Sequence, residues 1–282
     1  MSPRILAIAR VEMTIVRRNR WLFMATLIMV LFALALSFAG SAPTGSLGVD
    51  RLTVSVASMT TLSVYLAPLL ALMMSFDAIA GDVERGSLAL LLSYPAGRGE
   101  ILLGKYLAHL AALAIALVIG FGLAGAAATV GGGTGGGTGG GAGPESMRAL
   151  ARLIGSSILL GAVFLAFGYM LSAASGSPTA AAGGAAALWL VFVVLYDLGL
   201  LGAVVLDGGG SFTTNFFPWI MVANPADAFR LWNVAGTDSV AVATGMTGVA
   251  DSLPGWAAPL SVLTWLFIAF GLALAAFRRL EP

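Results

Sequence analysis

The sequence predicts an all-α polytopic membrane protein with six transmembrane helices. Hydrophobic residues make up 59% of the 282 residues and charged residues only 10%, whereas a soluble domain carries roughly 25% charged residues. Six segments are predominantly apolar over about 20 residues, the length that crosses roughly 30 Å of hydrocarbon. The Lys and Arg residues gather on one side of these segments, as in membrane proteins whose topology follows their basic residues.

The same composition excludes several classes of protein. A soluble domain could not cover so much apolar surface with 14 basic and 13 acidic residues, and a disordered chain would not be so apolar. A net charge of +1 offers no basic surface, so no nucleic-acid partner is expected. Because there is no Cys and one His, disulfides, thiolate metal sites and a multi-histidine centre within one chain are excluded. No metal site is therefore predicted.

The N-terminal segment, residues 1–20, is expected to form an amphipathic helix in the membrane interface. Apolar residues recur near helical spacing from Ile5 to Val16, while Arg10, Arg17 and Arg18 lie off that stripe. A basic flank that only sets the topology is the alternative.

Residues 21–282 are expected to form one transmembrane domain. Its first span is too long, and lacks the cleavage site, for a removable signal peptide. With a cytoplasmic N-terminus, ten of the 14 Lys and Arg residues lie inside and four outside, so both termini are expected in the cytoplasm. The six predicted spans are Trp21–Ala39, Thr53–Phe76, Ile101–Thr129, Ala149–Ala173, Ala180–Leu206 and Trp256–Phe277.

The predicted cytoplasmic loop, residues 77–100, contains a helix end followed directly by a helix start. Gly86 is expected to end the first helix as its C′ residue, and Ser87 to cap the second, which Pro95 would stop.

Leu88, Leu91 and Leu92 would give this second helix one apolar face. A short helix across the membrane surface, preceded by acidic residues, is typical of a docking element. A solvated connector is the alternative that the pattern leaves open.

Two outer segments are expected. Residues 131–143 are almost all glycine and predict a flexible linker; they lack the Walker lysine of a phosphate-binding loop. In residues 207–255, Asn224 and Pro225 predict a helix start, with Asp227 near its positive end. We interpret this second segment as a re-entrant or interfacial hairpin; a tethered surface helix without a partner is the alternative.

Few polar residues lie within the predicted spans. Asp197, beside Tyr196, is an acid at a depth where ionisable groups are costly and mark functional sites. No Lys or Arg lies at a similar depth in any span, so no ion-pair partner is evident; a protonated acid, a hydrogen-bonded acid and a position nearer the outer interface are left open. Two roles of Asp197 are equally favoured: a structural polar contact, or part of a pathway or gate. His109 is expected to be an interfacial hydrogen-bonding residue rather than a metal ligand, and the 11 Met residues to fill space rather than bind copper.

No catalytic motif is present in the sequence. There is no His-Glu-x-x-His, no Gly-x-Ser-x-Gly and no Walker motif. The chain is therefore expected to be non-catalytic, so any ATP-derived energy has to enter from a partner.

The run from Phe76 to Lys105, FDAIAGDVERGSLALLLSYPAGRGEILLGK, resembles the segment after span two in type-2 ABC transporter permeases. More closely, the chain looks like permeases of accessory transporters that serve maturation of nitrous oxide reductase. Residues 131–143 depart from that pattern. Further matches are Arg18–Trp21, Asp197–Leu198, Asn224–Leu231 and Asn233.

This resemblance implies a type-2 ABC exporter-like fold in the bacterial inner membrane. Two copies would form a dimer, each on a cytoplasmic ABC ATPase that binds ATP and Mg. A periplasmic copper-handling protein would dock outside, nitrous oxide reductase would be served indirectly, and membrane lipids would surround the spans. No cofactor is implied for this chain itself.

The resemblance also implies roles for particular residues. Those implied in coupling to the ATPase are Asp77, Asp82, Glu84, Arg85, Gly86, Ser87, Leu88, Leu91, Leu92 and Arg98. Those implied in contact with the periplasmic partner are Asn224, Asp227, Arg230 and Asn233.

The resulting hypothesis is a permease that transmits ATP-driven motion, with or without a copper or sulfur species, for copper-centre assembly on nitrous oxide reductase. One alternative is an ABC permease for another cargo, such as a drug, a lipid or a polysaccharide precursor. A second alternative is a polytopic membrane enzyme or an ion-coupled carrier.

Overall fold

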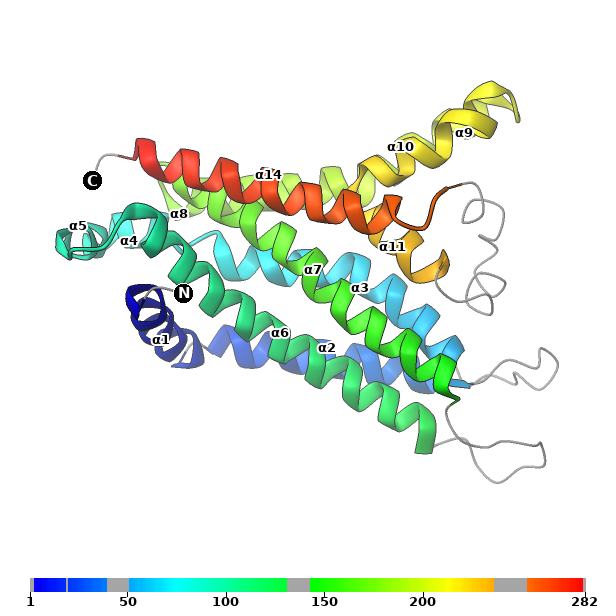
Figure 1. The fold of residues 1–282 in the computed structure, drawn as a ribbon, viewed down its shortest axis with the longest axis horizontal. Coiled ribbons are helices and arrows are strands. Elements are labelled where there is room, and N and C mark those ends of the chain that lie inside the picture. The colour runs from blue at the N-terminus through cyan, green and yellow to red at the C-terminus, as the bar shows by residue number, and fades with distance from the viewer. Residues whose placement is uncertain (1–2, 19, 40–50, 131–142, 236–252, 281–282) are drawn as a thin grey trace.

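The computed structural model describes residues 3–18, 20–39, 51–130, 143–235 and 253–280, which are helical apart from short connections (Figure 1). No strand occurs within these ranges. The helices are α1 Pro3–Arg18, α2 Arg20–Ala39, α3 Arg51–Ser75, α4 Ala80–Glu84, α5 Ser87–Ser93, α6 Arg98–Val130, α7 Pro144–Ala174, α8 Pro178–Trp189, α9 Tyr196–Asp207, α10 Phe217–Ala223, α11 Pro225–Ala235 and α14 Ala257–Arg279. The π-helical segments Leu190–Leu195 and Phe212–Phe216 precede α9 and α10, respectively.

Five helical stretches of the described chain are long and apolar enough to cross a membrane, which confirms the predicted all-α membrane fold. The helix α2 coincides with the remaining predicted span, and its described apolar part is Thr26–Ser37. The five stretches are Leu52–Glu84, Arg98–Thr129, Pro144–Ala174, Pro178–Asp207 and Ala257–Arg279.

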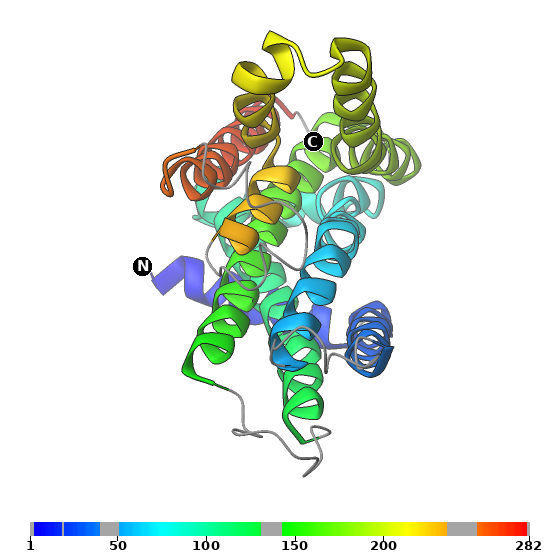
Figure 2. The same cartoon turned by 90° about the vertical axis from the view of Figure 1, so that its right-hand side faces the viewer.

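The central helix is α7, which packs against α3 on one side and α14 on another (Figure 2). Both termini lie at the same end of the molecule as α4 and α5, while α9, α10 and α11 lie towards the other end (Figure 1). The six-span topology requires the termini to share a side, and this arrangement agrees with it.

Small polar and aromatic side chains join the long helices. The hydroxyl of Ser63 on α3 donates to that of Ser157 on α7 at 2.8 Å, and the hydroxyl of Tyr106 on α6 donates to the carbonyl oxygen of Ala162 at 2.9 Å. The ring centroids of Phe167 on α7 and Trp265 on α14 lie 5.8 Å apart. Since lipid is as apolar as leucine, close packing and interhelical hydrogen bonds of this kind hold membrane helices together.

The outer segment folds back into the bundle. The helix α11 begins as predicted: Asn224 Oδ1 accepts from the backbone N–H of Ala226 at 3.0 Å. It packs against α14, α7 and α3, and Phe229 is fully buried. This packing does not fit a surface helix without a partner, and the re-entrant or interfacial hairpin stays a prediction. The expected linker at 131–142 and the end of the outer segment at 236–252 lie outside the described residues.

Candidate functional site

The loop between α3 and α6 is built around a glycine. Gly86 has a φ of 71°, in the left-handed region, and it ends α4 as predicted. The prediction that Ser87 caps α5 is wrong, because Gly86 occupies the N-cap position. The hydroxyl of Ser87 instead donates back to Asp82, at 3.2 Å to its carbonyl oxygen and 3.0 Å to Oδ1. Ser87 thus ties the two short helices together.

The apolar face predicted for α5 exists but faces the chain itself. Leu88 is buried, and Leu91 and Leu92 pack against the core. The apolar side chains that face outward are Leu90 and Tyr94, with 70% and 69% of their surface exposed. The spacing of the leucines predicted an apolar face on this helix, but it carries no information about which neighbour covers that face. If α5 docks onto a partner, Leu90 and Tyr94 are the apolar side chains available for the contact.

The start of α4 is held by the end of α7. The hydroxyl of Ser172 accepts hydrogen bonds from the backbone N–H groups of Ile79 and Ala80, both at 2.9 Å. These donors would otherwise be orphaned at a helix start. The loop is therefore fixed to the central helix.

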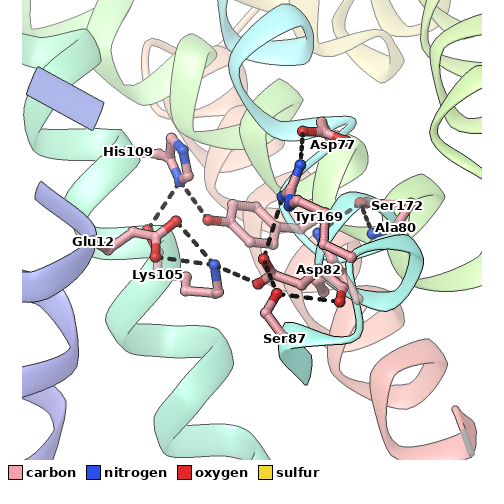
Figure 3. Close-up of polar contacts among 11 residues, drawn as sticks. Glu12, Asp77, Ala80, Asp82, Ser87, Lys105, His109, Tyr169 and Ser172 are labelled. Carbon is pink, nitrogen blue, oxygen red and sulfur yellow. Dashed lines mark hydrogen bonds and ion pairs between the residues drawn. The ribbon is translucent and has the colours of Figure 1, made fainter. Parts of the chain in front are cut away.

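Three charged side chains from three helices meet beneath this loop (Figure 3). Lys105 Nζ, on α6, lies 2.9 and 3.0 Å from the carboxylate oxygens of Glu12 on α1 and 2.9 Å from Asp82 Oδ2 on α4. The Lys105, Glu12 and Asp82 side chains are only 7%, 10% and 16% exposed. We call this group the Lys105 triad; it links α1, α6 and the loop.

Neither Glu12 nor Lys105 was among the predicted site residues. The signal that could have found them is an acid on the apolar stripe of α1, since a buried carboxylate needs a cation. The two helices can approach because residue 104 is glycine: a Cβ there would lie 2.7 Å from Cγ2 of Ile8.

His109 lies one turn beyond Lys105, is buried, and forms hydrogen bonds as expected. Its Nδ1 contacts the hydroxyl of Tyr169 and, at 3.2 Å, the carbonyl oxygen of Lys105. Within the described residues, no group of three or more His, Asp or Glu side chains is placed to hold a metal ion.

The remaining charges of the loop are more exposed. Arg85 reaches Asp77 Oδ2 at 3.4 Å and Asp82 Oδ1 at 3.3 Å. Partial burial lowers the pKa of the Arg85 guanidinium. The hydrogen bond with Asp82 and the negative charge of Asp77 raise it by more, so the pKa is raised overall. Such exposed pairs contribute little stability. Glu84 is exposed.

Arg98 connects the loop to the last span. Its Nη1 lies 3.1, 2.7 and 2.8 Å from the carbonyl oxygens of Phe277, Arg278 and Leu280 at the end of α14. These carbonyl groups have no partner within their own helix. The loop is therefore linked through polar contacts to α14 as well as to α1, α6 and α7.

A second charged cluster joins α9 and α11, towards the end of the molecule away from α4 and α5. Arg230 contacts Asp197 Oδ2 at 3.0 Å and Asp227 Oδ1 at 3.3 Å. Asp197 therefore has an ion-pair partner that was not evident in the sequence. Sequence reasoning missed the pairing of Arg230 with Asp197 because it placed this helix at the outer surface, whereas α11 packs into the bundle.

The side chains expected to contact a periplasmic partner are largely turned inward. Asn224 and Asp227 are each 1% exposed, and Asn224 Nδ2 donates to Asp227 Oδ2 at 3.1 Å. Asn233 is also buried and donates to the hydroxyl of Ser156 at 2.9 Å. The Tyr196 hydroxyl donates to the carbonyl oxygen of Ile220. Direct contact of the three buried side chains with a partner would require α11 to move.

We expect Asp197→Asn to lower the free energy of unfolding by about 1 kcal/mol. The effect is small because Arg230 still pairs with Asp227 and because the Asp197–Arg230 pair that is lost is partly solvated. Unfolding of the purified chain in detergent measures this, with the exposed Glu145→Gln as control. Full activity of the Asp197→Asn protein in cells would exclude an ionised role for Asp197 in a pathway or gate.

Comparisons with known proteins agree with this architecture. The model of the family described as "ABC-2 family transporter protein" matches residues 6–281. A protein of Pseudomonas aeruginosa named "Probable ABC transporter permease protein NosY" is 40% identical over 279 residues, covering 98% of each chain. A protein of the same name from Stutzerimonas stutzeri is 40% identical over 277 residues, covering 96% of this chain and 97% of the relative.

Proposed function

The chain belongs to the ABC-2 family of transporter proteins, and on that premise we propose that this ABC transporter permease serves assembly of the copper centre of nitrous oxide reductase. The observation that carries the proposal is the near-full-length similarity to two permeases named NosY. Family membership argues against the alternatives of a membrane enzyme or an ion-coupled carrier, and no observation favours another cargo.

The proposed partners follow from the same premise. Two copies of the chain form the membrane unit, and each binds a cytoplasmic NosF-like ATPase that holds ATP and Mg. A NosD-like periplasmic protein binds the outer face, responds to its change of shape and delivers copper to the reductase. The unit lies in the bacterial inner membrane with both termini in the cytoplasm, in agreement with their position beside α4 and α5.

The proposed mechanism is mechanical. The ATPase binds the outward face of α5 through Leu90 and Tyr94, which are exposed apolar side chains at the end of the molecule that holds both termini. Closure of the ATPase pair displaces α5 and α4. The Lys105 triad passes this displacement to α1 and α6, Ser172 to α7, and Arg98 to α14. The spans then tilt together and the outer face changes shape.

A deletion strain tests the proposed role. Without this gene, we expect nitrous oxide reductase to be made but to lack copper at its catalytic centre, which metal analysis and activity of the purified reductase would measure. Expression of the wild-type chain from a plasmid should restore both. A fully metallated and active reductase in the deletion strain would contradict the role.

A further inference from the structure

A cavity of about 270 Å³ lies beside the Lys105 triad, between α1, the end of α3, α4 and α6. Its lining combines two kinds of side chain. Ile15, Val16, Met73, Met74, Phe76 and Ala78 are apolar, whereas Glu12, Asp77, Asp82, Arg85, Lys105 and His109 are polar or charged. The proposed coupling mechanism uses the triad but leaves this space without a role.

The polar floor of the cavity includes a buried imidazole. His109 is only 7% exposed and lines the cavity. Its Nδ1 is occupied by the Tyr169 hydroxyl and the Lys105 carbonyl oxygen, while Nε2 has no hydrogen-bond partner among the described residues. Nε2 accepts in one tautomer and donates in the other, so a ligand that carries both a donor and an acceptor completes this site in either case.

The charges of the lining favour a cation. Three carboxylates, from Glu12, Asp77 and Asp82, face two cations, Lys105 and Arg85, so the lining has a formal charge of −1. Lys105 already uses its three donors on Glu12 and Asp82. Asp77 has only a long contact with the exposed Arg85 and keeps capacity to accept.

The apolar rim opens toward lipid. Ile15 on α1 and Met73 near the end of α3 line the cavity and are also exposed on the molecular surface, as is the nearby Val11. An amphipathic helix with exposed apolar residues and several Arg residues lies at the headgroup level of a bilayer. The cavity therefore has a charged interior and an apolar mouth at that level.

We propose that this cavity binds the headgroup of an aminophospholipid, phosphatidylethanolamine. The ammonium group donates to Asp77, and His109 Nε2 forms a hydrogen bond with the headgroup. The phosphate lies at the mouth near Arg85, and the acyl chains leave along Ile15 and Met73. An anionic lipid would add negative charge to a site that already has a formal charge of −1. A choline headgroup has no N–H donor for Asp77.

Lipid retention by the purified full-length chain tests this assignment. Delipidated protein would be mixed with equal amounts of phosphatidylethanolamine, phosphatidylglycerol and phosphatidylcholine of identical acyl chains, and bound lipids counted by native mass spectrometry. We expect about a tenfold preference for phosphatidylethanolamine over either competitor, as one or two charge-assisted hydrogen bonds provide. Asp77→Asn should reduce this preference at least threefold, since it removes one charged acceptor.

The matched control is Glu84→Gln, which neutralises an exposed acid of the same loop outside the cavity lining and should leave the preference unchanged. Equal retention of the three lipids by the wild-type chain would overturn the proposal, as would the same loss in both variants. Water-soluble glycerophosphoethanolamine should not displace the lipid at equal concentration; displacement would assign the site to a soluble phosphoethanolamine compound instead of a lipid.

Discussion

Replacing Lys105 with methionine is expected to lower the free energy of unfolding by about 3–5 kcal/mol, the usual cost of removing one partner of a buried ion pair. The substitution leaves Glu12 and Asp82 buried without the cation that both contact. Methionine keeps the length of the side chain, so the loss reflects charge rather than a cavity. Thermal and chemical unfolding of the purified chain in detergent would measure it.

A variant without any of the three charges separates this explanation from a simple packing defect. Glu12→Gln, Asp82→Asn and Lys105→Met together remove the unpaired carboxylates, so we expect this protein to recover most of the stability that Lys105→Met loses. Replacement of a whole buried ionic group is often nearly neutral. If the triple variant is no more stable than Lys105→Met alone, the charges of the Lys105 triad do not determine the effect.

The parts of this fold that the sequence predicted are those that depend on neighbouring residues along the chain. A bilayer requires long apolar helices, so composition and length were enough to place α3, α6, α7 and α14 within a few residues of their observed bounds. The turn at Gly86 and the start of α11 at Asn224 were predictable because each depends on local backbone geometry.

The parts that the sequence did not predict depend on which helices become neighbours. Glu12 and Lys105 are 93 residues apart, and Asp197 and Arg230 are 33 apart. Hydropathy indicates that a segment prefers lipid or protein, but it carries no information about which helix lies beside it. For the same reason the leucines of α5 were assigned to a partner, although the chain's own core covers them.

The docking surface that the structure offers is tested by Leu90→Asp. Leu90 is exposed on α5, so the change should alter the stability of the isolated permease by no more than about 0.5 kcal/mol. If Leu90 fills an apolar pocket of the ATPase, a buried carboxylate there should weaken binding by about 2 kcal/mol or more, roughly 30-fold in Kd. Titration of the ATPase onto the permease in lipid nanodiscs would measure this.

The matched control is Met147→Asp, which places the same charge on a half-exposed apolar side chain at the start of α7, at the end of the molecule away from α5. We expect it to bind the ATPase normally.

A charge reversal at Glu84 and Arg85 would be less specific, because Arg85 also contacts Asp77 and Asp82 and its loss would disturb the loop itself. Since Leu90 makes no contribution to the buried core, weakened binding by Leu90→Asp with unchanged thermal unfolding would point to the contact itself. Wild-type affinity in that variant would place the ATPase on another surface.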